Sequence, residues 1–243
     1  MNQTFAKGYR LVLFALIFLA GISAERLGLV EYYSDPWEFQ YVMLLTGQHL
    51  YLVGLSMLMA IVTGLAAGII FSRKSMQKYS GMVMYVIGLG QTIPSLAVLA
   101  LTMSFLGIGS KPAIFALFVY STLPIARNTL AGILSVSPAM IDAAKGMGMS
   151  PARILLEVEI PNALNVILTG IRVALVINIG TAALGYLIGA GGLGDLIFTG
   201  ISLMQPDKLL AGALPVVLMA LIGDFLIEIM SKIIVPKGIR IAQ

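Results

Sequence analysis

The sequence predicts an all-α polytopic membrane protein. Of its 243 residues, 59% are hydrophobic and 11% are charged, whereas a soluble domain has roughly 45–50% apolar and roughly 25% charged residues. The missing charge indicates that much of the exterior faces lipid. Six apolar runs approach or exceed the roughly 20 residues that cross a bilayer as a helix. Each run is therefore predicted to be one transmembrane helix.

The six predicted spans cover residues 5–24, 50–71, 82–106, 113–134, 163–187 and 209–230. They form a single domain, residues 1–243, because no linker or internal repeat divides the chain. In the first span, Lys7 and Arg10 must snorkel to lengthen a short apolar run. The alternative there is a secretory signal peptide, since a basic start and small residues near Ala24 also fit one.

Basic residues orient these spans, because cytoplasmic segments carry an excess of Lys and Arg. With both termini in the cytoplasm, eleven Lys and Arg residues lie on the inner side and three on the outer side. The inner residues are Lys7, Arg10, Arg73, Lys74, Lys78, Arg127, Lys145, Arg153, Lys232, Lys237 and Arg240. In the reverse topology the excess of Lys and Arg would lie on the outer side, which contradicts this rule in every loop.

Composition also excludes several classes of function. The chain has no Cys and a single histidine, His49, so we expect no disulfide and no metal site, and we assign His49 to the membrane interface. The net charge of +4 is not gathered into a patch, which argues against a nucleic-acid partner. The residue clusters of a membrane-embedded enzyme are missing too, so we predict no catalytic residue and no cofactor.

The segment of residues 137–161 is the longest predicted non-spanning stretch on the inner side. Ser-Pro pairs at 137–138 and 150–151 are typical of a helix start, with Ser as the N-cap and Pro in the first turn. Gly148 separates the two predicted helices, and Pro161 ends or kinks the second.

Both helices are too short to be stable alone in water, and each has an apolar face. These faces consist of Met140, Ala143, Ala144 and Met147 in the first helix, and Ile154, Leu155 and Val158 in the second. They require something to pack against. From the residues alone, docking to a partner protein and packing against the membrane surface or the chain's own bundle remain equal alternatives.

The same segment resembles the EAA motif of ABC-importer permeases: Glu-Ala-Ala, three residues, Gly, nine residues, then Ile-x-Leu-Pro. The matching residues, with the spacing kept, are Asp142, Ala143, Ala144, Gly148, Val158, Ile160 and Pro161. Asp, Val and Ile replace Glu, Ile and Leu of the motif. The resemblance implies that this segment docks into a cytoplasmic ATP-hydrolysing subunit.

A narrower similarity, over residues 54–201, resembles the osmoprotectant branch of that family, importers of glycine betaine, choline or carnitine. It rests on the stretches at 90–95, 144–148 and 188–195. Methionine permeases share part of the glycine-rich stretch, so an amino-acid substrate is the alternative. The resemblance implies a type I importer permease in the bacterial inner membrane. It also implies a second permease copy, identical or paralogous, two ATPase subunits and an external solute-binding protein.

A solute path is predicted where polar residues interrupt the spans. Pro94 removes a backbone hydrogen bond within the third span. Polar side chains accompany it and recur on the fifth span: Gln91, Thr92, Ser95, Asn178 and Thr181. Three tyrosines offer faces for a quaternary ammonium, although helix packing is favoured for each: Tyr85, Tyr120 and Tyr186.

Ionisable residues inside spans are functional suspects. We favour structural pairing over a transport role for Arg172. Asp224, Glu228 and Lys232 follow one another at i, i+4 spacing, which predicts an ion-pair ladder rather than proton coupling. The rival function is an ion-coupled secondary transporter, which typically contains two repeats with broken helices, and we find no such repeat.

Gly189, Gly191 and Gly194 match the dinucleotide fingerprint, but no strand precedes them. We interpret them as a tight outer turn after the fifth span. Gly64 and Gly68 predict close helix packing.

Overall fold

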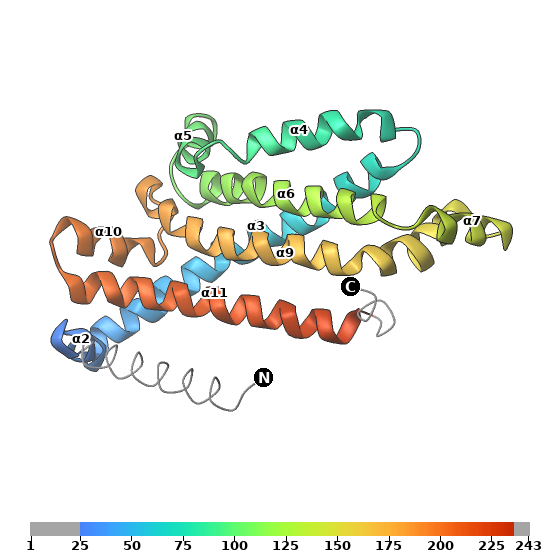
Figure 1. Ribbon diagram of the computed structural model, residues 1–243. Coiled ribbons are helices and arrows are strands. Elements are labelled where there is room, and N and C mark those ends of the chain that lie inside the picture. Colours follow the sequence, from blue (N-terminus) through green and yellow to red (C-terminus); the bar gives the residue numbers. More distant parts are fainter. Residues whose placement is uncertain (1–24, 236–243) are drawn as a thin grey trace, which may run out of the picture.

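The protein is a helical bundle with no strand in residues 25–235, the part that the computed structural model describes. Its long helices are α3 (Pro36–Ser72), α6 (Ser110–Leu134), α9 (Ile160–Ala182) and α11 (Pro206–Ile234) (Figure 1). In this part, four helices are long and apolar enough to cross a membrane, or five if one bent pair counts as a span. Five predicted spans therefore have counterparts, and the first lies outside the described residues.

Helix α3 starts well before the predicted second span. Asp35 accepts a hydrogen bond from Trp37 N at 2.8 Å, and Pro36 occupies the first turn, so both favour a helix start. The prediction began at Leu50 because polar residues such as Gln48 interrupt the apolar run. In the folded chain these polar groups find partners inside the bundle, so the helix continues through them.

The predicted third span is broken rather than kinked. Helix α4 (Ser80–Gly90) and helix α5 (Ser95–Leu106) meet at 92°. Pro94 has an extended backbone and precedes the first residue of α5. Proline fits a helix start but not a helix interior, and three further non-helical residues widen the break.

Helices α3 and α6 pack closely through glycine, as predicted. A Cβ added at Gly64 would lie 2.8 Å from Ile125 Cβ, and one at Gly68 would lie 2.4 Å from Thr129 Cβ. No side chain fits at either distance, so glycine sets the separation of the two helices.

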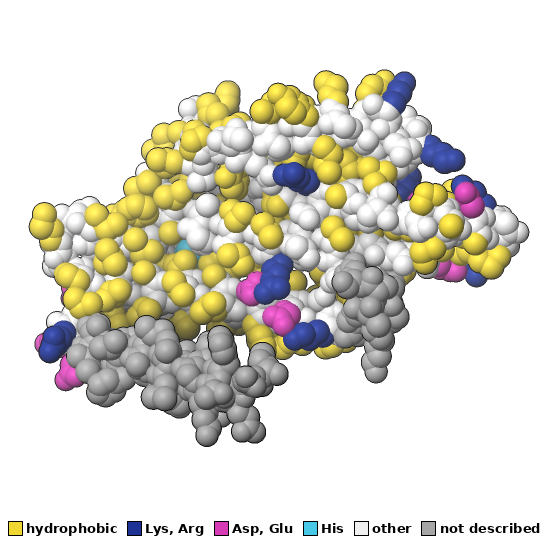
Figure 2. Space-filling view, in the orientation of Figure 1, with side chains coloured by type: hydrophobic (Ala, Val, Ile, Leu, Met, Phe, Trp, Pro, Cys, Tyr) yellow, Lys and Arg dark blue, Asp and Glu magenta, His cyan; other side chains and the backbone are white. Residues whose placement is uncertain are grey.

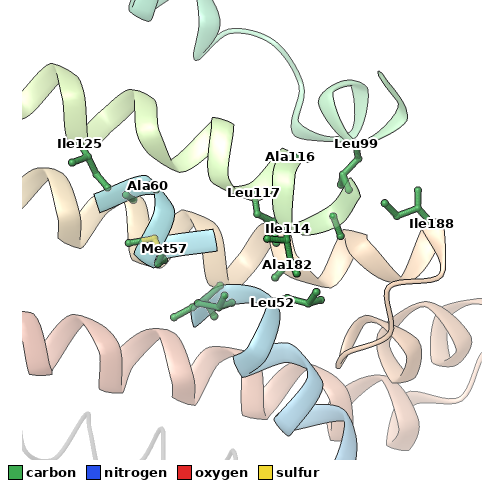
Figure 3. Packing of buried hydrophobic residues seen from close by; sticks show 14 residues of the cluster. Leu52, Met57, Ala60, Leu99, Ile114, Ala116, Leu117, Ile125, Ala182 and Ile188 are labelled. Carbon is green, nitrogen blue, oxygen red and sulfur yellow. The ribbon is translucent and has the colours of Figure 1, made fainter. Parts of the chain in front are cut away.

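A buried apolar cluster joins α3, α5, α6 and α9 (Figure 3). Next to it lies a buried polar group: Asn178 Nδ2 donates to Ser121 Oγ at 2.7 Å and to Ser56 Oγ at 3.0 Å. Since these residues belong to α9, α6 and α3, the hydrogen bonds tie three helices together. Breaking one of them would leave a buried polar atom unpaired, at a cost of about 1–3 kcal/mol.

A glycine turn closes one end of the bundle, where α10 (Gly194–Ser202) follows the 3-10 helix Ala183–Ile188. Gly189, Gly191 and Gly192 have φ of 75°, 76° and 85°, a region that favours glycine. Gly192 N donates to Gln48 Oε1 at 3.0 Å. The predicted turn is therefore present, and α3 holds it.

His49 is completely buried, so its assignment to the membrane interface was wrong. Its Nε2 lies 2.9 Å from Ile179 O, and a Cβ added at Gly192 would lie 3.3 Å from its Nδ1. The ring therefore fills the space between α3, α9 and the glycine turn. One residue in a long apolar helix gives no sequence signal for this role.

Candidate functional site

The segment that matches the EAA motif lies at the end of the bundle opposite the glycine turn, where α7 (Pro138–Gly146) projects beyond the long helices (Figure 1). Both predicted helix starts are present. The Ser150 hydroxyl accepts from Arg153 N at 3.4 Å, whereas the Ser137 side chain makes no capping bond. The second helix start is therefore capped by its serine side chain, and the first is not.

The second predicted helix is not separate. Of the two effects predicted for Pro161, ending or kinking this helix, the first is wrong. Helix α8 (Pro151–Ile154) runs through a π-helical turn (Leu155–Glu159) into α9, giving one helix over Pro151–Ile188. Ile160 N donates to Leu155 O across the π turn. Pro161 lacks an N–H, and its ring would clash with the carbonyl four residues earlier in a regular helix. The wider π turn leaves more room for the ring.

Each apolar face of the segment is divided between the bundle and the surface. Ala144 and Ile154 are buried within the chain. Met140, Met147 and Ala143 are exposed, and Met147 retains 74% of its accessible surface. One side of the segment is therefore fixed to its own bundle, and the other presents an apolar surface. Packing against the chain's own bundle therefore applies to the buried side, and docking to a partner protein remains a prediction for the exposed side.

Polar residues flank this exposed surface. Lys145 Nζ donates to Asp142 Oδ1 at 2.6 Å, and this bond lowers the pKa of the Asp142 carboxyl, so the carboxylate stays charged at neutral pH. Gly148 has φ of 76°, and a Cβ there would meet nothing within 4 Å. Glycine is favoured there by backbone conformation and not by crowding within the chain. Val158, Ile160 and Pro161 are partly buried along the π turn and the start of α9.

An ion pair missed by the sequence analysis anchors the segment. Arg73, which caps the end of α3, places Nη2 2.6 Å from Glu159 Oε2, and the Glu159 side chain is 11% exposed. Arg73 Nε also donates to Ile69 O at 3.2 Å. Glu159 stands at the variable position of the motif and Arg73 is far away in sequence, so no pattern linked them.

Charge reversal of this pair tests its contribution. We expect Glu159→Arg to lower the free energy of unfolding by about 1–3 kcal/mol or more, because it leaves a poorly hydrated charge without a partner. The double variant Arg73→Glu/Glu159→Arg should recover part of the loss. Thermal unfolding of the two single variants and the double variant in detergent measures the coupling. Additive losses would show that the pair does not contribute.

The structure brings together only some of the predicted path residues. Ser95 of α5, Tyr120 of α6 and Thr181 of α9 line one small hollow. Gln91 and Thr92 lie at the break between α4 and α5, where Thr92 Oγ1 donates to Leu89 O at 2.7 Å.

The other aromatic and polar candidates differ in their surroundings. Asn178 is fully buried in the hydrogen-bond group described above. Tyr186 stacks on Phe198 with ring centroids 6.0 Å apart, which confirms packing for this tyrosine. Tyr85 is 67% exposed on α4, so the packing expected for it is absent within the chain.

The ion-pair ladder of α11 is present and extends to α9. Arg172 binds Asp224 through both Nε and Nη2, and its Nη2 lies 3.7 Å from Glu228 Oε2. Lys232 Nζ lies 2.6 Å from Glu228 Oε1. The predicted structural pairing of Arg172 is therefore confirmed, and it joins two spanning helices.

Comparison with known proteins assigns the family. Residues 50–238 match the model of the binding-protein-dependent transport system inner membrane component. The chain belongs to this family. Permeases of this family are membrane components of ABC importers and not enzymes.

Two relatives of this permease carry names of osmoprotectant transport. The osmoprotectant import permease protein OsmY of Salmonella typhimurium is 44% identical over 235 residues, 96% of each chain. The carnitine transport permease protein OpuCB of Listeria monocytogenes is 42% identical over 198 residues, 82% of this chain and 90% of the relative.

Solved importers share the fold of this permease. The MetNI methionine ABC transporter in an inward-facing conformation superposes with a TM-score of 0.67 at 24% identity, covering 80% of this chain and 98% of that chain. An amino acid ABC transporter gives the same TM-score at 20% identity, covering 83% and 97%. The likeness confirms the predicted type I importer permease fold.

Proposed function

We propose that this chain is the permease subunit through which an ABC importer moves a small osmoprotectant, such as glycine betaine, carnitine or choline, into the cell. The similarity to the osmoprotectant import permease, which extends over 96% of both chains, carries this proposal. The chain has no phosphate-binding loop, G-x-x-x-x-G-K-[ST]. A separate ATPase subunit must therefore supply the energy.

The end of the bundle that carries α7 faces the cytoplasm in this proposal. The basic residues at that end include Arg73, Lys74, Lys78, Lys145 and Arg153, whereas those toward the glycine turn are Arg26, Lys111 and Lys208. This distribution agrees with the excess of basic residues on the cytoplasmic side of bacterial inner-membrane proteins. The glycine turn then faces the external binding protein.

The exposed side of α7 docks into the ATPase subunit in this mechanism. A short helix with exposed Met140, Ala143 and Met147 offers an apolar surface to a groove, and Asp142 and Lys145 fix its register. Two permease copies with two ATPase subunits form the complex. ATP-driven closure of the ATPase dimer moves α7, and the two bundles alternate between outward-open and inward-open states.

Residues at the helix break and in the small hollow line the proposed solute path, and all but Pro94 have polar side chains: Gln91, Thr92, Pro94, Ser95 and Thr181. The break exposes polar groups that a continuous helix would satisfy, and such groups are tolerated at membrane depth where they line a cavity. Asn178 is left out of the path because its amide is fully buried.

Reconstitution of the complete complex tests the function. The permease, its ATPase subunit and its binding protein are purified together and placed in liposomes, and uptake of radiolabelled glycine betaine, carnitine, choline and methionine is measured with and without ATP. We expect ATP-dependent uptake of at least one quaternary ammonium solute. ATP-dependent uptake of methionine alone would assign an amino acid as substrate. Uptake without the ATPase that a proton uncoupler abolishes would favour a secondary transporter.

A further inference from the structure

Two arginines lie inside spanning helices, away from the helix ends, among the residues that the structure describes. Arg172 of α9 has carboxylate partners on α11. Arg127 of α6 has none: its hydrogen bond in the described part of the chain runs from Nη1 to the neutral Gln91 Oε1, at 3.3 Å. The sequence analysis counted Arg127 among the inner-side residues, but α6 continues to Leu134. Arg127 is thus an exposed cation seven residues before the end of a helix that is long and apolar enough to cross a membrane.

Arg127 and Arg172 lie at a similar depth in the bundle. Gly170 of α9 packs against α6 so closely that an added Cβ would lie 2.6 Å from Asn128 Cβ. Arg127 precedes Asn128 and Arg172 follows Gly170 within one helical turn. Figure 2 shows basic side chains at separate places on the surface formed by α4, α6, α9 and α11, and acidic side chains adjoin the lower of them.

The position of the Arg127 guanidinium argues against snorkelling to the nearer membrane surface. Arg127 lies about 10 Å before the end of α6, seven residues at 1.5 Å each. Its side chain points the other way, toward Gln91, which caps the far end of α4. An arginine that faces lipid within a spanning helix is unfavourable. The surface around Arg127 therefore faces water or another polar group.

We propose that Arg127 binds the carboxylate of a zwitterionic solute on its way through the bundle. This inference rests on the proposed function and refines it: the preferred cargo carries both a quaternary ammonium and a carboxylate, as glycine betaine and carnitine do. A guanidinium pairs with a carboxylate through two parallel hydrogen bonds, and the single neutral contact with Gln91 leaves most of its donors free for this.

The surroundings of Arg127 also suit the cationic end of such a solute. Tyr120 lies seven residues before Arg127, which places both on one side of α6. Tyr120 lines the hollow with Ser95. Ser95 starts α5 and follows Gln91 across the break between α4 and α5. An aromatic face attracts a quaternary ammonium. The carboxylate site and an aromatic surface therefore follow one another along the proposed path.

Uptake of two solutes by matched variants tests the proposal. Complexes reconstituted with wild-type permease, Arg127→Gln, Arg127→Lys or the control Lys111→Gln are given glycine betaine or choline, which lacks a carboxylate. Lys111 is exposed at the start of the same helix. We expect Arg127→Gln to lower glycine betaine uptake about tenfold or more and choline uptake less than about twofold. Arg127→Lys should recover part of the loss, and Lys111→Gln should resemble wild type. Every variant receives solute from the same binding protein. The solute preference of that protein therefore cancels when the uptake of each variant is divided by that of wild type.

Each other outcome is decisive. An equal loss of uptake of both solutes in Arg127→Gln would indicate that Arg127 stabilises the bundle or its contact with the second permease copy, and would overturn the proposal. Unchanged uptake of both solutes would also overturn it. Wild type that carries choline but not glycine betaine would overturn it while leaving the osmoprotectant function standing. Wild type that carries none of glycine betaine, carnitine and choline would overturn both. If wild type carries carnitine alone, carnitine takes the place of glycine betaine in the measurement below.

If wild type carries glycine betaine alone, ATP hydrolysis provides the second measurement. Arg127→Gln must then lose uptake while keeping ATP hydrolysis that the binding protein stimulates. Joint loss of uptake and hydrolysis would overturn the proposal.

Discussion

Replacing Gly148 by leucine, or Asp142 by lysine, is expected to abolish transport while the permease still inserts into the membrane. The first change puts a branched side chain at φ of 76°, a backbone conformation that costs L-residues about 1–2 kcal/mol, and adds bulk to a surface proposed to dock. The second change reverses the charge beside Lys145 and breaks their 2.6 Å contact. Uptake by reconstituted complexes and the amount of permease in the membrane fraction measure the two effects separately.

Gly146→Ala provides a matched control for the loop. Gly146 ends α7, and a Cβ there meets nothing within 4 Å, so this variant should keep its transport activity. Normal uptake in both Gly148→Leu and Asp142→Lys would contradict the coupling assignment of the segment. Co-purification with the ATPase subunit shows whether a variant that no longer transports has lost docking or a later step.

Gly68→Ala is expected to give a large loss of stability. The new Cβ would lie 2.4 Å from Thr129 Cβ and 2.9 Å from Ala126 O, so α3 and α6 must separate. Overpacking of this kind typically costs about 1–3 kcal/mol. The thermal unfolding midpoint in detergent, followed by tryptophan fluorescence or circular dichroism, measures it.

Gly54→Ala on the same helix is the control for Gly68→Ala. A Cβ at Gly54 meets nothing within 4 Å, and alanine is the better helix former by about 0.5–1 kcal/mol. Its midpoint should equal or exceed that of wild type. If both variants unfold alike, the close contact between α3 and α6 does not limit stability.

Local patterns predicted much of this fold. The apolar runs located five spans, and the spacing of Gly64 and Gly68 identified a helix contact, because each signal depends on residues close in sequence. The Ser150-Pro151 pair marked a helix start for the same reason. The family resemblance then gave the segment its proposed partner, which the residues alone left open.

Features that depend on distant residues were missed. His49 resembles an interfacial residue until Ile179 O, on another helix, is placed 2.9 Å away. Arg73 and Glu159 lie on separate spans, and only the fold shows their contact. Pro161 usually marks a helix end, but the π turn before it depends on packing that a proline rule does not include. The broken third span has the same origin, since apolar composition does not distinguish a bent pair from a straight helix.

The π turn has a mechanical consequence for the whole molecule. Because it keeps the helix unbroken from Pro151 to Ile188, the segment beside α7 and the glycine turn are opposite ends of one rod about 57 Å long, 38 residues at 1.5 Å each. His49 contacts Ile179 of this helix, and Gly192 lies just beyond its end. We expect a displacement at the end near α7 to change how these two residues pack.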